Sequence, residues 1–206
     1  MAGGAPGIAA LAGALLGLLP ATGLAAPGEQ PGEALPLAIY RDAGSPANHG
    51  AWSITPADAV ARTRLAFDHR DRPADGETAL RLEFTLPPLA WTAVIVTSAP
   101  GYWGTTPGPA LALGHARRLA FRARGALGGE RIRVRAGVAG DQPFGDSALL
   151  PIDSGWLELS NAWRRYTLPI EDVRFTRVVT PFVVIVNHAH NPTGQVTLFL
   201  DEIVYE

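Results

Sequence analysis

The sequence predicts an all-β fold, an antiparallel β-sandwich of the jelly-roll type, from three observations. Short runs of apolar, β-branched and aromatic residues recur along the whole chain, and many of them alternate with polar residues. Glycine and proline, with 23 and 18 residues, fall mostly between these runs. Helix signals hardly occur. A single domain of about eight to ten short strands fits this pattern and the length of 206 residues.

The expected strands can be placed in order along the chain. Leu37–Tyr40 is apolar and ends in a turn. Apolar and polar residues alternate over Leu80–Thr85, and Trp91–Thr97 is rich in β-branched and aromatic residues. The best helical candidate is Thr55–Leu65, opened by a proline. Further strands are expected at Trp156–Leu159, Arg165–Leu168, Phe182–Val186 and Val196–Tyr205.

A β-hairpin is predicted in the middle of the chain. Two alternating runs, Arg118–Arg124 and Arg131–Ala136, flank a glycine-rich segment at 125–129. In such a hairpin five arginines would share one face: Arg122, Arg124, Arg131, Arg133 and Arg135.

Composition excludes several classes of function. The formal net charge of −2 provides no field that would recruit nucleic acid. The chain has no cysteine, which excludes disulfides and thiolate chemistry. All 17 basic residues are arginine, so Schiff-base and phosphate-loop lysines are excluded as well.

The N-terminus predicts export to a secreted or periplasmic location. The apolar run Ile8–Leu19 is too short to span a bilayer comfortably, and small residues suit cleavage after Ala25. Residues 1–25 are therefore expected to be a signal peptide, 26–36 a linker and 37–206 the domain, with no membrane span in the mature chain. The alternatives are an uncleaved anchor or a cytosolic Ala/Gly-rich tail.

Two motifs at the ends of the domain carry a resemblance. Tyr40-Arg41-Asp42 ends the first strand, and Phe199-Leu200-Asp201-Glu202-Ile203 lies in the last one. Between them, Tyr102-Trp103-Gly104 looks like the loop before a central strand. The pattern resembles galactose-binding-like jelly-roll modules, including the family-11-like carbohydrate-binding modules.

The resemblance implies a galactose-binding-like jelly roll, a glycan ligand and a structural calcium ion between the first and last strands. Carboxylates from both ends of the chain suit the oxygen coordination of calcium, so Asp42, Asp201 and Glu202 are the candidate ligands. Alternatively, Asp42 caps a turn and the other two are solvated residues.

Glycan binding needs flat aromatic faces flanked by polar groups that contact hydroxyls. Trp91, Tyr102 and Trp103 lie in or near a Gly/Pro-rich loop and are the candidate platforms. Asp146, Asn187 and Asn191 are candidate hydroxyl partners, whereas Trp156, Trp163 and Tyr166 are expected to pack in the core or at a sheet edge.

The arginines admit two interpretations. Arg122 and Arg133 could bind an acidic glycan bidentately. Alternatively, the strip forms a solvated ion-pair network with Glu83, Glu130 or Glu158.

The sequence contains no G-x-S-x-G, H-E-x-x-H or phosphate-loop motif. His188 and His190 have the spacing of two metal ligands on an extended segment, but further ligands are not evident. We therefore expect a non-catalytic glycan-binding module. The alternatives are a jelly-roll polysaccharide lyase or hydrolase that uses His188, His190 and Tyr102, or a structural module of a cell-surface assembly.

Overall fold

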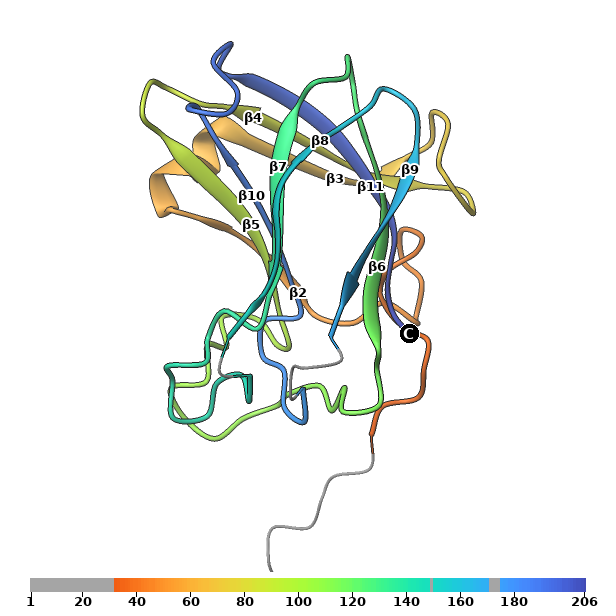
Figure 1. Ribbon diagram of the computed structural model, residues 1–206, viewed down its shortest axis with the longest axis vertical. Coiled ribbons are helices and arrows are strands. Elements are labelled where there is room, and N and C mark those ends of the chain that lie inside the picture. The colour runs from red at the N-terminus through yellow and green to blue at the C-terminus, as the bar shows by residue number, and fades with distance from the viewer. Residues whose placement is uncertain (1–31, 149, 171–174) are drawn as a thin grey trace, which may run out of the picture.

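The structure, a computed structural model, describes residues 32–148, 150–170 and 175–206. Two antiparallel β-sheets pack face to face over one core (Figure 1). The all-β sandwich predicted from the sequence is confirmed. The expected signal peptide and most of the expected linker lie outside the described residues. Within the described ranges, no helix has the length and apolar character needed to cross a membrane.

The described residues form a six-stranded sheet in the order β3-β4-β11-β6-β9, with β1 paired to the end of β11. Its strands are β1 (Leu37–Tyr40), β3 (Thr63–His69), β4 (Ala79–Thr85), β6 (Arg118–Gly125), β9 (Arg164–Pro169) and β11 (Gln195–Tyr205).

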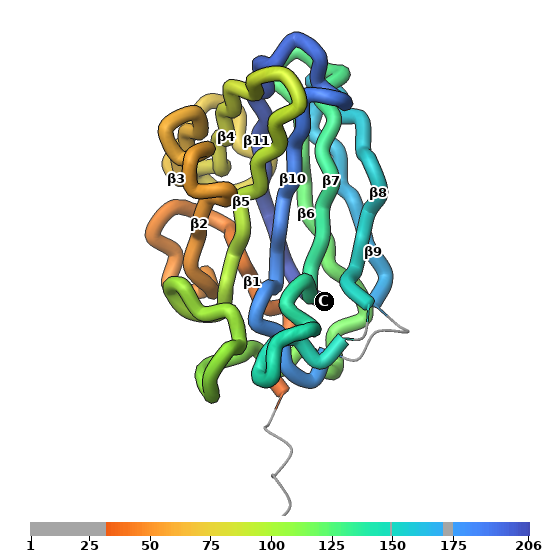
Figure 2. The backbone as a smooth tube through the Cα atoms, turned by 90° about the vertical axis from the view of Figure 1, so that its left-hand side faces the viewer, coloured from red at the N-terminus to blue at the C-terminus, as the bar shows by residue number. Residues whose placement is uncertain are grey.

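The second sheet is five-stranded, in the order β2-β5-β10-β7-β8, and Figure 2 shows its strands side by side. Its strands are β2 (Ala51–Thr55), β5 (Trp91–Thr97), β7 (Arg131–Ala136), β8 (Ile152–Glu158) and β10 (Phe182–Asn187). A short 3₁₀ helix, η1 (Ala57–Arg62), connects β2 to β3 across the two sheets. The helical candidate Thr55–Leu65 therefore contains one short 3₁₀ helix and the start of β3.

Alternation along the strands decides which side chains enter the core. Leu80, Leu82 and Phe84 of β4 are buried between the sheets together with Val94 and Val96 of β5. Burial of this apolar surface is the main term that stabilises the sandwich.

The predicted hairpin of β6 and β7 is wrong. β6 pairs with β11 and β9 in the six-stranded sheet, whereas β7 pairs with β10 and β8 in the five-stranded sheet. The glycine-rich segment crosses from one sheet to the other, and the carboxylate of Glu130 accepts hydrogen bonds from the N–H groups of Leu127 and Gly128 within it. Strands that face each other across a core show the same alternation as strands paired in a hairpin, so the pattern could not separate the two cases.

The predicted arginine strip is divided for the same reason. Arg122 and Arg124 lie on the six-stranded sheet, whereas Arg133 and its neighbours on β7 lie on the five-stranded sheet. The two sets face opposite sides of the sandwich because both strands direct their apolar residues into the core between the sheets.

Candidate functional site

The outer face of the five-stranded sheet has an apolar centre. Ile95 of β5 pairs with Val183 of β10, and Ala93 pairs with Ile185 in the adjacent row. These side chains form a small cluster separate from the main core, and Ala93, Ile95 and Val183 are buried although they point away from that core. Because these residues are buried on an outer face, longer side chains and loops must border the apolar centre. A bordered apolar surface of this kind is typical of ligand-binding sites.

Two tryptophans stand on this face, on different strands. Trp91 begins β5 opposite Asn187 and is 48% exposed. Trp156 of β8 lies opposite Arg133 of β7 and is partly exposed. Three strand spacings, about 14 Å, separate the two tryptophans across the sheet order β5-β10-β7-β8. Trp156 lies in the row of Ala93, so the two are also offset by two residues along the strands. The face thus carries an aromatic side chain on each side of its apolar centre.

A polar chain positions the second tryptophan. The ring of His190 stacks on Trp156 with the centroids 3.8 Å apart and the planes at 17°. Oδ1 of Asn187 accepts hydrogen bonds from the backbone N–H of His190 at 3.0 Å and from its ring Nδ1 at 2.8 Å. Because an amide oxygen can only accept, Nδ1 carries the proton. In a neutral ring, Nε2 is then an acceptor for a ligand hydroxyl.

Arginines border the same face. Arg133 binds Asp153 through two hydrogen bonds, one of them 2.7 Å from Nε to Oδ1, and Arg135 approaches the same carboxylate at 3.2 Å. Burial acts to raise the pKa of Asp153, but hydrogen bonds from Arg133 and from the N–H of Gly155 lower it overall. Arg131 pairs with Glu158 at 2.8 Å. On this sheet the arginines therefore belong to an ion-pair network, as one interpretation of the sequence had it.

Neither Trp156 nor His190 was predicted to bind a glycan, because Trp156 was expected in the core or at a sheet edge and His190 was considered only as a metal ligand or catalytic residue. The register of β7 and β8 shifts between Arg133 and Arg135, so Asp153 and Trp156 point the same way although they are three residues apart. Gly155 has a φ of +64° at this bulge, and the Ser154 hydroxyl accepts a hydrogen bond from the N–H of Val134. A glycine inside a strand pattern signals such a bulge, and this signal could have placed Trp156 on the outer face.

The predicted loop aromatics lie at the other end of the sheet. Tyr102 and Trp103 follow the end of β5, whereas Trp91 begins it, so the three do not form one cluster. Trp103 is 37% exposed, and the Tyr102 hydroxyl donates to the carbonyl of Thr106 at 2.9 Å. Their loop is joined to the segment after β7 by a hydrogen bond from the N–H of Phe144 to the carbonyl of Gly104.

Two predicted hydroxyl partners are buried and bonded within the protein. Asp146 accepts four hydrogen bonds, from the N–H groups of Ala139, Val179 and Thr180 and from the Thr180 hydroxyl. Asn191 is bonded to both backbone groups of Arg131. These contacts hold loops in place, so neither side chain is positioned to contact a ligand.

Arg122 also lies away from this face, on the six-stranded sheet, where it pairs with Glu202. It therefore cannot share a ligand with Arg133, which lies on the opposite side of the sandwich.

Two of the three carboxylates expected to bind calcium, Asp42 and Asp201, hold the β3–β4 loop, whereas Glu202 pairs with Arg122. Oδ1 of Asp42 accepts hydrogen bonds from the N–H groups of Glu77 and Thr78 at 2.7 and 2.8 Å. Oδ2 of Asp201 accepts from Ala74 and Asp75 at 2.8 and 3.1 Å. Among the described residues, no three His, Cys, Asp or Glu side chains are grouped to hold a metal ion. Calcium binding stays a prediction.

Asp201 is fully buried in a bulge of β11, where the register with β6 shifts. Burial raises its pKa to about 6, although backbone hydrogen bonds from Asp75, Glu202 and Ala74 act in the opposite direction. The pKa of Asp201 is thus much closer to neutral pH than that of an ordinary aspartate.

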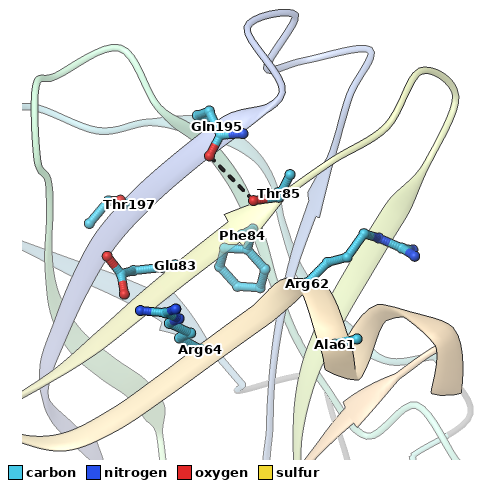
Figure 3. A pocket seen from close by; sticks show the side chains of 8 residues that line it. All are labelled: Ala61, Arg62, Arg64, Glu83, Phe84, Thr85, Gln195 and Thr197. Atoms are coloured by element: carbon cyan, nitrogen blue, oxygen red, sulfur yellow. Dashed lines mark hydrogen bonds between the residues drawn. The ribbon is translucent and has the colours of Figure 1, made fainter.

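A polar hollow of about 310 Å³ opens on the outer face of the six-stranded sheet (Figure 3). Arg64 and Glu83 face each other in it, and Thr85 and Gln195 join through a hydrogen bond of 3.3 Å. Its aromatic residue, Phe84, belongs to the buried core. The hollow therefore offers no exposed ring on which a sugar could stack.

The residues of the rival enzyme hypothesis are not brought together. His188 and His190 follow the end of β10, whereas Tyr102 follows the end of β5. Because β5 and β10 are antiparallel, these positions lie at opposite ends of the sheet.

Neither a family model nor a curated protein matches the chain. Solved structures do match. A crystal structure of a family 30 carbohydrate-binding module is 21% identical, with a TM-score of 0.50 over 84% of this chain and 99% of that one. A second is 19% identical, with a TM-score of 0.50 over 84% and 88%. The family 30 module of the cellulosomal cellulase Cel9D-Cel44B of Clostridium thermocellum is 18% identical, with a TM-score of 0.49 over 84% and 98%.

The first two of these likenesses show the fold. The chain is a two-sheet antiparallel jelly roll with the architecture of carbohydrate-binding modules. The particular resemblance to family-11-like modules stays a prediction.

Proposed function

We propose that the protein is a secreted, non-catalytic carbohydrate-binding module that binds a polysaccharide or glycan on the outer face of its five-stranded sheet. The observation that carries the proposal is the pair of tryptophans, Trp91 and Trp156, on one face with polar groups between them. The described structural neighbours, which are carbohydrate-binding modules, support it. The signal-like N-terminus supports secretion.

The chemistry of this face suits a sugar chain. An indole ring stacks on the C–H face of a pyranose, and a span of about 14 Å is longer than a single sugar ring. Asn187, His190 and Arg133 lie between or beside the tryptophans and provide donors and acceptors for hydroxyl groups. Each tryptophan would thus bind a different unit of one chain.

The test is affinity electrophoresis of the protein against neutral and acidic polysaccharides. We expect at least one polysaccharide to retard the wild type, and Trp91→Ala and Trp156→Ala each to reduce that retardation about tenfold or more in affinity. Leu89→Ala is the matched control, because Leu89 is 97% exposed and lies two residues before Trp91.

Two results would overturn the proposal. Retardation that persists in the Trp91→Ala, Trp156→Ala double variant would place the ligand elsewhere, for example at Trp103. Release of reducing ends or of unsaturated products from the same polysaccharides would show that the protein is an enzyme.

A further inference from the structure

On the opposite side of the sandwich, Arg124 is a buried cation without an acidic partner. It lies on β6 in the outer face of the six-stranded sheet and is only 4% exposed. Its Nε is buried without a hydrogen-bond partner, and the described residues place no carboxylate within ion-pair distance of the guanidinium. Its neighbour on the same face, Arg122, has Glu202 as a partner. Burial lowers the pKa of Arg124, and the charge of Arg72 lowers it further.

Aromatic rings cover the guanidinium. Its Cζ lies 3.7 Å from the centroid of Phe199 and 5.2 Å from that of Trp163. Stacking of this kind offsets part of the free-energy cost of burying a charge. A carboxylate partner would offset more of it. Stacking also leaves the N–H groups at the edge of the guanidinium free. These N–H groups bind oxyanions that lie in the plane of the guanidinium.

Two further nitrogens without partners surround the same phenyl ring. The His69 ring lies 4.8 Å from Phe199, and Arg81 is the residue paired with Phe199 on β4. His69 Nε2 and Arg81 Nε are both buried without hydrogen-bond partners, although Nη2 of Arg81 pairs with Glu83 at 2.6 Å. Burial lowers the pKa of His69, and the charges of Arg81 and Arg124 lower it further, whereas the charge of Asp71 opposes them.

The β3–β4 loop lies beside these groups. The indole Nε1 of Trp163 donates to the carbonyl of Arg72 at 2.8 Å, which fixes the loop near β9 (Figure 1). Of the three acids in this loop, Asp71, Asp75 and Glu77, it is Asp71 whose charge acts on Arg124, and it also approaches Arg72 at 3.6 Å, so its charge is shared with that arginine. Arg72 and Arg81 thus have Asp71 and Glu83 beside them, whereas Arg124 has no carboxylate partner among the described residues.

We propose that Arg124, with His69 and Arg81, forms a binding site for a single oxyanion, the carboxylate of a uronic acid or a sulfate group. The anion binds the free edge of the guanidinium beside Phe199. This site is independent of the sugar-stacking face, because it lies on the other sheet and shares no residue with it.

The test measures melting temperature during titration with sodium sulfate and, separately, sodium glucuronate, each against sodium chloride at the same ionic strength. Because sulfate stabilises proteins in general, the informative quantity is the difference between variants. We expect a saturable rise of about 3 °C in the wild type that Arg124→Met lacks. Arg118→Met is the matched control, because Arg118 lies on the same strand but pairs with Glu206 at 2.8 Å.

Equal shifts in the wild type and in Arg124→Met, or no saturable shift with either anion, would overturn the proposal. A shift with glucuronate alone or with sulfate alone would support it and identify the source of the oxyanion. If Arg124→Met does not fold, the site is tested instead by NMR of the wild type during anion titration. The His69 and Trp163 ring signals should then move with added anion while the Trp91 indole signal does not, and static His69 and Trp163 signals would contradict the site. Trp91→Ala, which tests the sugar-stacking face, should leave the anion response unchanged.

Discussion

His190 lies flat against Trp156, with the ring centroids 3.8 Å apart, and is held there by Asn187. One face of the indole is therefore covered by an imidazole, so the other face and the edge of His190 remain for a ligand. The orientation of Trp156 thus depends on a loop residue that follows a different strand.

Replacement of His190 by alanine should weaken glycan binding about tenfold without affecting folding. The substitution removes a stacked ring and a hydrogen-bond acceptor beside Trp156. Affinity electrophoresis with the polysaccharide that most retards the wild type measures the change. His188→Ala serves as the control in the same loop, and equal weakening by both variants would contradict a specific role for His190.

Asp146→Ala should lower the free energy of unfolding by about 3 kcal/mol, because four donors would lose their acceptor in a buried place. Urea unfolding measures this loss. Asp141→Ala, an exposed aspartate in the same segment, is the control. At a temperature where both variants are folded, their glycan binding should equal that of the wild type. Weakened binding by Asp146→Ala alone would show that Asp146 contacts the ligand.

The free energy of unfolding should depend on the pH through Asp201. Its pKa in the folded protein is about 6, above the ordinary value of 3.8, so the folded state holds the proton more tightly. The resulting stabilisation is fully present below pH 3.8 and is lost as the pH rises through about 6. The shift corresponds to about 3 kcal/mol.

The Asp201→Asn variant isolates this contribution, because the carboxylates with lowered pKa values, such as Asp42 and Asp153, are present in both proteins. We expect the wild type to lose stability relative to the variant between pH 4 and 7. Parallel stability profiles in urea over this range would show that Asp201 does not titrate there.

If calcium binds to Asp42, Asp201 and Glu202, it should raise the melting temperature, and a chelator should reverse the rise. The ion would compete with the N–H donors that now occupy Asp42 and Asp201, so we expect a rise of only a few degrees. Asp42→Asn should abolish it. Asp58→Asn, which changes an exposed carboxylate paired with Arg62, should not. A melting temperature indifferent to both calcium and chelator would refute this prediction.

Most of the strands could be predicted because alternation and β-branched composition act locally. Val196–Tyr205 and Trp91–Thr97 were predicted almost to the residue. β2 and β3 were missed because their apolar residues are sparser and lie around Pro56 and the 3₁₀ helix.

The candidate site was harder to predict, because it depends on how strands are distributed between sheets. One of the two partners of β7 is β10, about fifty residues further on, and no local pattern near Arg133 indicates this. Asn187 and Trp91 were selected from the sequence, but their direct pairing was not. Trp156 was expected in the core or at a sheet edge. It does lie on the edge strand β8, and the bulge at Gly155 turns it to the outer face.

The pairing of β1 with the end of β11 has a practical consequence. Leu37 lies opposite Tyr205, so the chain enters and leaves the sandwich at the same end. Trp91 and His190 lie at the other end of the five-stranded sheet, where β5 begins and β10 finishes. A tether at either terminus would therefore hold the molecule on a sensor surface with Trp91 and His190 directed outward, whichever terminus is chosen.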